Sequence, residues 1–453
     1  MRGVSVLVVL AAVTLCAGGE YFPDWSSLDT RPSPSWYDEA KIGIFLHWGV
    51  FSVPSFKSEW FWNLWQNDDF EVIEFLKKNY PPGWTYADFA PQFRAEFFDP
   101  DRWAALFEKS GAKYVVLTSK HHEGFTNWPS STAFNWNSRD IGPGRDLVGD
   151  LRTAVRKRSL RFGVYHSMMD WYHQLYLKDK QNNWKTQHFV EAKCNNELYE
   201  LVNQYEPDIL WSDGEWEAPS RYWNSTNFLA WLYNESPVKD VIVVNDRWGK
   251  ETRCKHGDFY NCDDRFNPGT LQEHKWENCM SLDRSSWGYR RTMTLDDVLT
   301  IEELLKTLAE TISCHGNILI NVGPRSDGTI DPLFEERLTQ LGEWLQLNGE
   351  AVYGSRPWKD QRDAADENVW YTQNNGNVYG IVTSWPQVLK LGSFNSTSFD
   401  EHATVTIIGY DEPLLVSREA DGITIHFPAL SSKSKPIYLP VLEFALPAKA
   451  LTG

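Results

Sequence analysis

The chain has 453 residues, enough for one large domain and a smaller second one. Its 44 lysines and arginines are outnumbered by 61 aspartates and glutamates, which gives a net charge of −17. A chain this acidic repels the phosphates of nucleic acids and of anionic lipids. The composition therefore argues against nucleic acid and the membrane surface as partners.

The first 19 residues have the pattern of a signal peptide. Arg2 precedes an apolar run from residue 4 to 16, and small residues follow at 17–19. The run is too short to span a bilayer, and no later segment is long and apolar enough, so we expect no membrane insertion. We therefore predict passage through the secretory pathway to the lysosome or the extracellular space. Three glycosylation sequons fit this route: Asn224, Asn234 (with Pro237 just beyond it) and Asn395.

Five cysteines remain after removal of such a signal: Cys194, Cys254, Cys262, Cys279 and Cys314. An odd number leaves at least one thiol unpaired within the chain. Cys254 and Cys262 are close enough in sequence for a local disulfide, while the remaining pairing stays open. No pair has the CxxC spacing of a zinc site.

Short apolar runs alternate with amphipathic segments through most of the chain. The runs are Ile42–Leu46, 114–117, 162–165, 209–211, 241–244 and 318–320, and the amphipathic segments are 101–109, 147–158, 197–205 and 298–312. Continuous, partly β-branched runs are typical of strands buried on both faces, and their alternation with helices indicates parallel βαβ units. We predict a (β/α)₈-like barrel over residues 20–354, with a doubly wound sheet as the alternative.

The pattern changes after a last predicted helix, which opens at Asp331-Pro332 and ends at Asn348-Gly349. From residue 355 to 453 apolar residues recur with period two, and Asn375-Gly376 is a strong hairpin signal. The predicted strands are 369–371, 378–382, 405–408, 423–427 and 441–446. This part predicts a C-terminal antiparallel β-sandwich.

The most informative stretch is 205–216, where a short apolar strand ends at Asp213 between Trp211 and Trp216. The carboxyl ends of barrel strands form one face of the molecule, so polar side chains there line a common concave site. The residues that end the predicted strands are His47, His121, His122, Tyr165, His166, Asp213, Asn245 and Arg247. Flat indole faces beside a carboxylate suit a ring-shaped substrate such as a sugar.

The adjacent histidines 121 and 122 raise the question of a metal. Neighbouring residues on a strand point to opposite faces, and the His-x-x-x-His spacing of metalloproteases is missing, so we expect no metal and no cofactor. Neutral histidines that donate hydrogen bonds to sugar hydroxyls fit better. Glu59 and Trp60 follow the first strand and are interpreted as part of the sugar-binding wall, although an aromatic lid is the alternative.

A sugar-cleaving site needs a second carboxyl group, held protonated to release the leaving group. Two acidic candidates follow the fifth predicted strand, the pair Asp263-Asp264 within 260–265 and Glu277 within 274–279. We expect both in long loops, where desolvation beside aromatic rings raises the pKa of a carboxyl. Surface charges are the alternative.

Several of these segments together resemble the α-L-fucosidases of glycoside hydrolase family 29, of the animal lysosomal or secreted type. The resemblance runs from about Tyr21 to the C-terminus. It is closest in residues 47–54, 58–60, 118–128, 210–216 and 244–249, and in the spaced signature Pro268-x-x-Leu271-x-x-x-Lys275-Trp276-Glu277-x-Cys279.

The resemblance implies a barrel with a C-terminal β-sandwich, a retaining mechanism and fucosylated glycans as substrates. It implies that Asp213 is the nucleophile, with Asp264 as first and Glu277 as second choice for the acid/base. The positions that match fucose-binding residues are His47, Glu59, Trp60, His121, His122, Tyr165, Trp211 and Arg247. Cys279 belongs to the signature, although the chemistry needs no thiol. A homotetramer is implied by resemblance alone.

Two other functions remain open on sequence grounds: a barrel glycosidase for a different sugar, and an inactive, lectin-like fucose-binding protein on the same scaffold. The presence of Asp213 together with two later acids favours the enzyme over the lectin.

Overall fold

The computed structural model describes residues 19–394, 399–410, 412–429 and 438–446. The predicted signal peptide, apart from its last residue, and the predicted glycosylation site at Asn395 lie outside these ranges. In the described part of the chain, no helix is long and apolar enough to cross a membrane.

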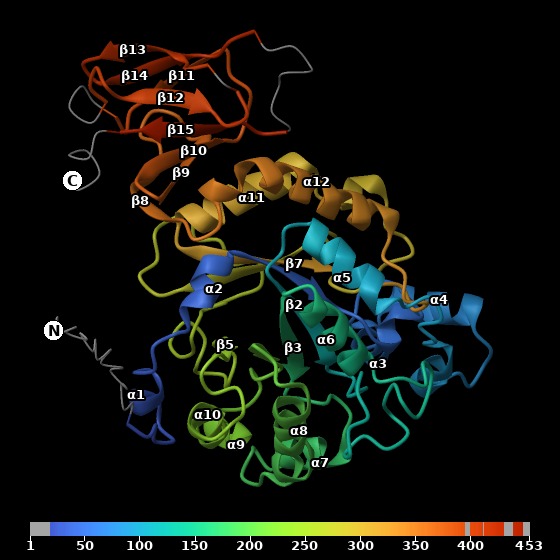
Figure 1. Ribbon diagram of the computed structural model, residues 1–453. Helices are drawn as coiled ribbons and strands as arrows, with labels where there is room; N and C mark the ends of the chain where they lie inside the picture. Colours follow the sequence, from blue (N-terminus) through green and yellow to red (C-terminus); the bar gives the residue numbers. More distant parts are fainter. Residues whose placement is uncertain (1–18, 395–398, 411, 430–437, 447–453) are drawn as a thin grey trace, which may run out of the picture.

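The larger part of the molecule is a parallel sheet that curls into a barrel (Figure 1). Its strands are β1 (Ile42–Leu46), β2 (Tyr114–Lys120), β3 (Arg161–Ser167), β4 (Ile209–Asp213), β5 (Val243–Val244), β6 (Trp276–Ser281) and β7 (Gly316–Val322). They pair in the order β5-β4-β3-β2-β1-β7-β6. Every residue of β1, β2 and β4 is buried, as expected for strands covered on both faces. The barrel prediction is confirmed, with seven regular strands in the described residues.

An irregular segment, 258–260, lies between the edge strands β5 and β6. Its first two amides donate to the Val244 carbonyl at 3.0 and 3.3 Å. Its last residue donates to the Lys275 carbonyl and accepts from the Glu277 amide, both at 2.9 Å, in a parallel bridge. The segment therefore occupies the place of an eighth strand, and the chain leaves it directly toward Asp264.

The helices surround the sheet (Figure 1). They are α1 (Trp25–Leu28), α2 (Ser35–Ala40), α3 (Phe61–Gln66), α4 (Phe70–Asn79), α5 (Pro100–Lys109), α6 (Leu147–Lys157), α7 (Gln174–Gln181), α8 (Asn195–Tyr205), α9 (Ser220–Trp223), α10 (Ser225–Asn234), α11 (Ile301–Ser313) and α12 (Pro332–Asn348). The five helices predicted from apolar spacing correspond to α5, α6, α8, α11 and α12. Asp146 and Asp331 cap α6 and α12 by accepting backbone amides of the first turn.

Glu277 is the main error in the element prediction, because it lies in β6 and not in a loop. It is fully buried and accepts hydrogen bonds from Tyr37, Tyr114 and Trp211 at 2.6, 2.8 and 2.9 Å. A carboxylate that is paired inside the barrel breaks the apolar run by which the other strands were recognised, so this strand was missed.

The C-terminal part forms two antiparallel sheets, ordered β12-β15-β10-β9-β8 and β11-β14-β13. The strands are β8 (Arg356–Arg362), β9 (Val369–Asn374), β10 (Asn377–Val382), β11 (Val388–Leu391), β12 (Thr404–Ile407), β13 (Leu415–Glu419), β14 (Gly422–His426) and β15 (Val441–Ala445). The predicted turn at Asn375-Gly376 joins β9 and β10, with φ of 50° and 83°. The two sheets share an apolar core, as the sandwich prediction requires.

The five-stranded sheet lies against α11, which β8 and β9 contact (Figure 1). The Trp344 indole of α12 donates to the Leu439 carbonyl at 2.9 Å, and the Thr372 hydroxyl of β9 donates to the Ala351 carbonyl at 2.7 Å. Both groups are buried, so the two parts of the chain share a packed interface.

The predicted disulfide between Cys254 and Cys262 is present. Cys194, Cys279 and Cys314 are buried free thiols. The predicted glycosylation site Asn234 is half-buried, and its side-chain amide exchanges hydrogen bonds of 2.9 and 2.8 Å with the backbone of Tyr21. Asn224 is also half-buried. Glycosylation at either residue stays a prediction.

Candidate active site

A pocket of about 440 Å³ opens at the carboxyl ends of the barrel strands. Its lining comprises Phe45, His47, Glu59, Trp60, His121, His122, Tyr165, Trp211, Asp213, Trp216, Arg247, Arg253, Asp263, Asp264 and Trp287. All eight residues predicted to bind the sugar are among them, together with Asp213 and Asp264. Glu277, Cys279 and the strand-end residues His166 and Asn245 are not.

Asp213 is the last residue of β4 and is buried in the pocket floor. Its Oδ2 accepts from the Tyr165 hydroxyl at 2.8 Å, and its Oδ1 accepts from Nη1 of Arg247 at 3.0 Å. Burial alone raises the pKa of Asp213, but the Arg247 charge and these two hydrogen bonds outweigh it, so the pKa falls below its ordinary value. The carboxylate is therefore ionised and aimed at the pocket.

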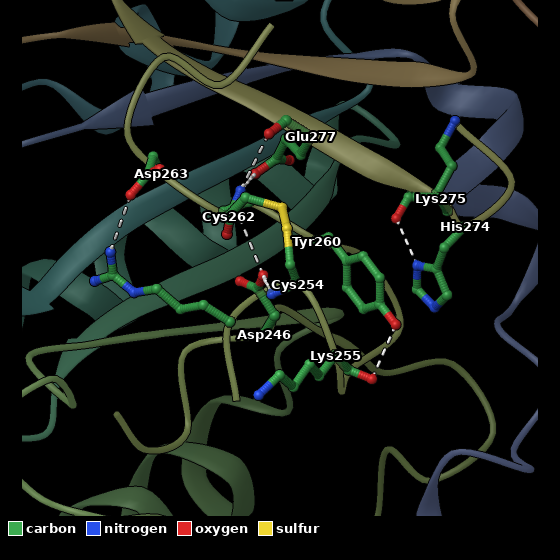
Figure 2. Close-up of a disulfide and its surroundings, with 11 residues drawn as sticks. Asp246, Cys254, Lys255, Tyr260, Cys262, Asp263, His274, Lys275 and Glu277 are labelled. Carbon is green, nitrogen blue, oxygen red and sulfur yellow. Dashed lines mark hydrogen bonds and ion pairs between the residues drawn. A yellow bond between two sulfur atoms is a disulfide. The ribbon is translucent and has the colours of Figure 1, made fainter. Parts of the chain in front are cut away.

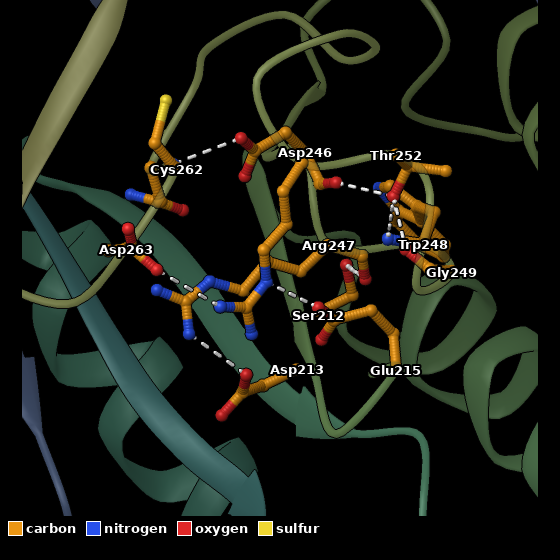
Figure 3. A network of polar contacts seen from close by, with 12 residues as sticks. Ser212, Asp213, Glu215, Asp246, Arg247, Trp248, Gly249, Thr252, Cys262 and Asp263 are labelled. Atoms are coloured by element: carbon orange, nitrogen blue, oxygen red, sulfur yellow. Dashed lines mark hydrogen bonds and ion pairs between the residues drawn. The ribbon is translucent and has the colours of Figure 1, made fainter. Parts of the chain in front are cut away.

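Arg247 connects Asp213 to the second acid. Its side chain is 3% exposed, and its Nη2 donates to Oδ1 of Asp264 at 2.7 Å. The Asp264 side chain is 54% exposed, so it lies at the mouth of the pocket while Asp213 lies at the floor. Figure 3 shows Arg247 reaching from the segment after β5 toward Asp213. One guanidinium thus holds two carboxylates on the same side of the barrel.

His47 has a tautomer that its contacts determine. Its backbone amide donates to Oδ1 of Asn321 at 3.2 Å, so that oxygen is an acceptor, and Nδ1 of His47 lies 2.8 Å from it and must carry the proton. Burial lowers the pKa of His47 to about 3, so the ring is neutral. Its Nε2 is therefore a hydrogen-bond acceptor, so the prediction that this ring donates to a sugar hydroxyl is wrong.

The same argument applies to His122. The Ser167 hydroxyl donates to the Met169 carbonyl at 2.9 Å, so it accepts from Nδ1 of His122 at 2.6 Å. Burial holds the pKa of His122 well below its ordinary value. Its unprotonated Nε2 lies 3.7 Å from Oδ2 of Asp213, where it can accept a hydrogen bond from a hydroxyl group.

Glu59 and Trp60 form one wall of the pocket. Oε2 of Glu59 accepts from the amides of Trp287 and Gly288, both at 3.0 Å, which fixes the carboxylate. The Trp60 ring is nearly parallel to that of Trp216, with centroids 6.2 Å apart, and meets His122 edge-on. These flat apolar faces beside polar acceptors match the C–H faces and hydroxyls of a sugar.

The two signature residues outside the pocket lie inside the barrel. Burial raises the pKa of Glu277 and of the Cys279 thiol. The Glu277 carboxylate fixes the Trp211 indole through its Nε1, and it contacts the pocket only through that ring. Cys279 packs in the apolar barrel interior.

Three lining residues were missed from the sequence: Phe45, Arg253 and Trp287. Phe45 lies two positions before His47 on β1, so strand periodicity places both on the same face and was the available signal. Arg253 and Trp287 come from loops, where the sequence carries no such pattern.

The one cluster of possible metal ligands among the described residues is Asp246, Cys254 and Cys262. Its two sulfurs form the disulfide, and Asp246 accepts hydrogen bonds from the backbone amides of both cysteines. The donor set therefore does not fit a metal.

Comparison with known proteins gives a consistent result. Residues 8–350 match the family described as Alpha-L-fucosidase, and residues 361–444 match the Alpha-L-fucosidase C-terminal domain. The chain is 56% identical over 438 residues to the alpha-L-fucosidase of Branchiostoma floridae, covering 95% of this chain and 97% of the relative. It is 55% identical over 437 residues to the human tissue alpha-L-fucosidase, covering 96% of this chain and 92% of the relative.

Solved structures are similar as well. The alpha-fucosidase of Thermotoga maritima in complex with a mechanism-based inhibitor superposes with a TM-score of 0.82 at 34% identity, covering 94% of this chain and all of that one. The extent of these matches, over both parts of the chain, shows that this protein belongs to the alpha-L-fucosidase family.

Proposed function

We propose that this chain is an exo-acting α-L-fucosidase that hydrolyses terminal α-L-fucose from glycoproteins, glycolipids and oligosaccharides with retention of configuration. The observation that carries the proposal is the pair of carboxylates on one arginine. Asp213 is ionised at the pocket floor, and Asp264 is held by the same Arg247 at the pocket mouth. Family membership supplies the sugar class.

In the first step, Asp213 attacks the anomeric carbon of the bound fucose. The bond between that carbon and the leaving oxygen breaks, and Asp264 gives its proton to the leaving oxygen. The product is a fucosyl ester of Asp213. The lowered pKa of Asp213 keeps the nucleophile ionised, as this step requires.

In the second step, Asp264 takes a proton from water while the water oxygen attacks the anomeric carbon. The ester bond to Asp213 breaks, and the second inversion restores the original configuration. Retaining enzymes place the two carboxyl groups about 5–5.5 Å apart. The shared contact with Arg247 supports Asp264 in this role, and the burial of Glu277 away from the pocket argues against the alternative.

The remaining pocket residues bind the sugar. The unprotonated Nε2 atoms of His47 and His122 accept hydrogen bonds from sugar hydroxyls, and Glu59 provides a fixed carboxylate. Trp60 and Trp211 offer flat apolar faces. Buried side chains fill the barrel interior beneath the pocket. A pocket that is closed at one end suits a terminal sugar better than an internal one, which supports exo action.

The test is the hydrolysis of an aryl α-L-fucoside followed by proton NMR of the first product formed. We expect α-L-fucose to appear first and to mutarotate later. Appearance of β-L-fucose first contradicts a retaining mechanism, and absence of turnover contradicts the enzyme assignment. Matched aryl galactosides and mannosides test the sugar class.

The proposal extends to the setting of the enzyme. We place it in the secretory pathway, lysosomal or extracellular, with a signal peptide over residues 1–19, a catalytic barrel over 20–354 and a β-sandwich over 355–453. Glycans at Asn224, Asn234 and Asn395 and assembly into a homotetramer belong to the same proposal. Mass spectrometry and light scattering of the secreted protein test them.

A further inference from the structure

Residues 245–247, which directly follow β5, connect β4, the strand that ends at Asp213, to the loop that carries Asp264. Oδ1 of Asn245 accepts from the Ser212 amide at 3.0 Å, and its Nδ2 donates to Asn261 at 3.1 Å. Arg247 bridges Asp213 and Asp264. The middle residue, Asp246, contacts neither acid, and its function is not explained by the site described above.

Asp246 is fully buried and binds both ends of the disulfide loop. Its Oδ2 accepts from the amide of Cys254 at 2.8 Å and from the amide of Cys262 at 3.1 Å. Figure 2 shows the carboxylate beside the disulfide, and Figure 3 shows its contact with Cys262. The carboxylate and the disulfide therefore fix the same two backbone positions.

Those two positions lead directly to the pocket. Arg253 precedes Cys254, and its Nε donates to the buried Glu215 at 2.6 Å, two residues beyond Asp213. Asp263 and Asp264 follow Cys262 without an intervening residue. Cys262 is buried, whereas the Asp264 side chain is half exposed. The path of the backbone at Cys262 therefore decides where Asp264 lies above the pocket.

We propose that Asp246 and the Cys254–Cys262 disulfide act together as a positioning clamp for Asp264. The proposal rests on Asp264 being the acid/base. The clamp residues touch neither substrate nor reacting atoms. They act by holding the carboxyl of Asp264 at the distance from the leaving oxygen that proton transfer requires.

Loss of the clamp has a specific kinetic consequence. Proton transfer to the leaving oxygen slows, while attack by Asp213 on a substrate with a good leaving group does not depend on that proton. A displaced acid costs up to about 100-fold in rate. We expect a loss of about 10- to 100-fold in kcat/KM on methyl α-L-fucoside and less than about 3-fold on dinitrophenyl α-L-fucoside.

The experiment compares four full-length variants with the native enzyme on these two substrates. The double variant Cys254→Ser/Cys262→Ser removes the disulfide, and Cys314→Ser makes the same substitution at a buried free thiol as its control. Asp246→Ala removes the acceptor, and Asp246→Asn keeps an acceptor oxygen as its control. We expect the double variant and Asp246→Ala to lose activity selectively on methyl fucoside, and both controls to retain it.

Asp246→Ala leaves the disulfide in place, so it tests the proposal even where the double variant does not fold. Equal losses on the two substrates in both variants overturn the clamp, because a general structural defect does not distinguish leaving groups. A native-like profile in both variants overturns it as well.

Asp264→Asn, measured in parallel, separates this proposal from the proposed function. Azide should accelerate its turnover of dinitrophenyl fucoside and yield α-fucosyl azide, since the acid/base is then missing. If Asp264→Asn shows this pattern and the clamp variants do not, the clamp alone is wrong. If Asp264→Asn lacks it, the acid/base assignment is wrong and the clamp proposal falls with it.

Discussion

At the scale of single residues, Arg247 does the most to define the site. Its guanidinium is buried and donates hydrogen bonds to both carboxylates. Its Cζ lies over the Trp211 ring, 4.7 Å from the ring centroid. Desolvation raises the pKa of Asp213, but the charge of Arg247 and the hydrogen bonds from Arg247 and Tyr165 outweigh it, so the pKa falls below its ordinary value. Asp213, the proposed nucleophile, therefore stays ionised in a mildly acidic medium.

Arg247→Met should move the acidic limb of the pH profile of kcat/KM to higher pH. Because Arg247 lowers the pKa of Asp213, its removal raises that pKa, and the nucleophile becomes protonated at a higher pH. Initial rates on an aryl fucoside between mild acid and neutrality give the profile. An acidic limb that stays in place would mean that Asp213 does not control it.

Asp213→Gly should reduce turnover by about 10⁴-fold or more, in the range found when a covalent nucleophile is removed. The fold should survive, since the side chain ends a strand and packs no core. Azide should restore part of the activity on an aryl fucoside and give β-fucosyl azide, the product of a single inversion. Near-normal activity without azide would rule out Asp213 as the nucleophile.

Much of this site was predictable, because in a parallel barrel a polar residue at the end of a short apolar run lies at the carboxyl end of a strand, where the pocket forms. His47, Tyr165 and Asp213 each follow an apolar run, and the structure brings them to one pocket. Glu277 shows the limit. Its identity as an acid in the signature says nothing about whether it faces the pocket or the tyrosines of the barrel interior, which depends on the register of β6.

At the scale of elements, a buried ion cluster joins α8 to β2 behind the pocket. Glu197 of α8 is fully buried, with Oε2 2.7 Å from Nζ of Lys120 and Oε1 2.7 Å from Nζ of Lys193. His166 of β3 lies 3.4 Å from the same carboxylate, and burial lowers its pKa to about 4. Lys120 directly precedes His121, so this cluster fixes the strand end that carries the two pocket histidines.

Glu197→Gln should destabilise the protein by about 3–5 kcal/mol, because it leaves two buried lysines without a counter-charge. Glu191→Gln, an exposed change on the preceding turn, is the matched control and should stay within about 0.5 kcal/mol. Thermal unfolding followed by circular dichroism measures both. Equal melting temperatures for the two variants would show that the cluster adds no stability.

The difference in the free energy of unfolding between the native enzyme and Glu197→Gln should depend on pH. Burial raises the pKa of Glu197, but Lys120 and Lys193 outweigh it and hold the pKa well below its ordinary value. Its contribution is therefore present above the unfolded pKa of about 4.3 and is lost as the pH falls further. The native enzyme and Glu197→Gln should therefore become more similar in free energy of unfolding as the pH falls below about 4.3.

The elements themselves were predicted unevenly, for physical reasons. Helices such as α6 and α11 bury one apolar face, which the sequence displays directly. The irregular segment 258–260 occupies the place of a strand but is held there by only a few backbone hydrogen bonds. Such bonds leave no pattern of side chains in the sequence, so the segment could not be predicted. In the sandwich, three strands were missed. Charged and exposed residues dominate β8 and β13, and β11 has only four residues, of which two are exposed.

At the scale of the whole molecule, the C-terminal part of the chain packs against helices of the barrel. Its strands β8 and β9 contact α11 (Figure 1), and Leu439 accepts a hydrogen bond from α12. The pocket, in contrast, is lined by strand ends and loops of the barrel, from Phe45 to Trp287. Trp370, Tyr379 and Val441 belong to the same apolar cluster as the barrel helices. The sandwich therefore contributes to the stability of the barrel and supplies no pocket residue among those described.

Trp344→Ala should show whether the sandwich affects the stability of the barrel alone or also the chemistry of the pocket. The indole is fully buried between α12 and the sandwich, so its loss should cost about 3–5 kcal/mol through the cavity and the lost contacts. Trp344→Phe keeps most of the ring and should cost less, about 1–3 kcal/mol, because the Leu439 carbonyl loses its donor. Assayed well below their melting temperatures, both variants should keep the native KM and the native ratio of rates on activated and unactivated fucosides. A change in that ratio would mean that the sandwich acts on the pocket through α12, and not on stability alone.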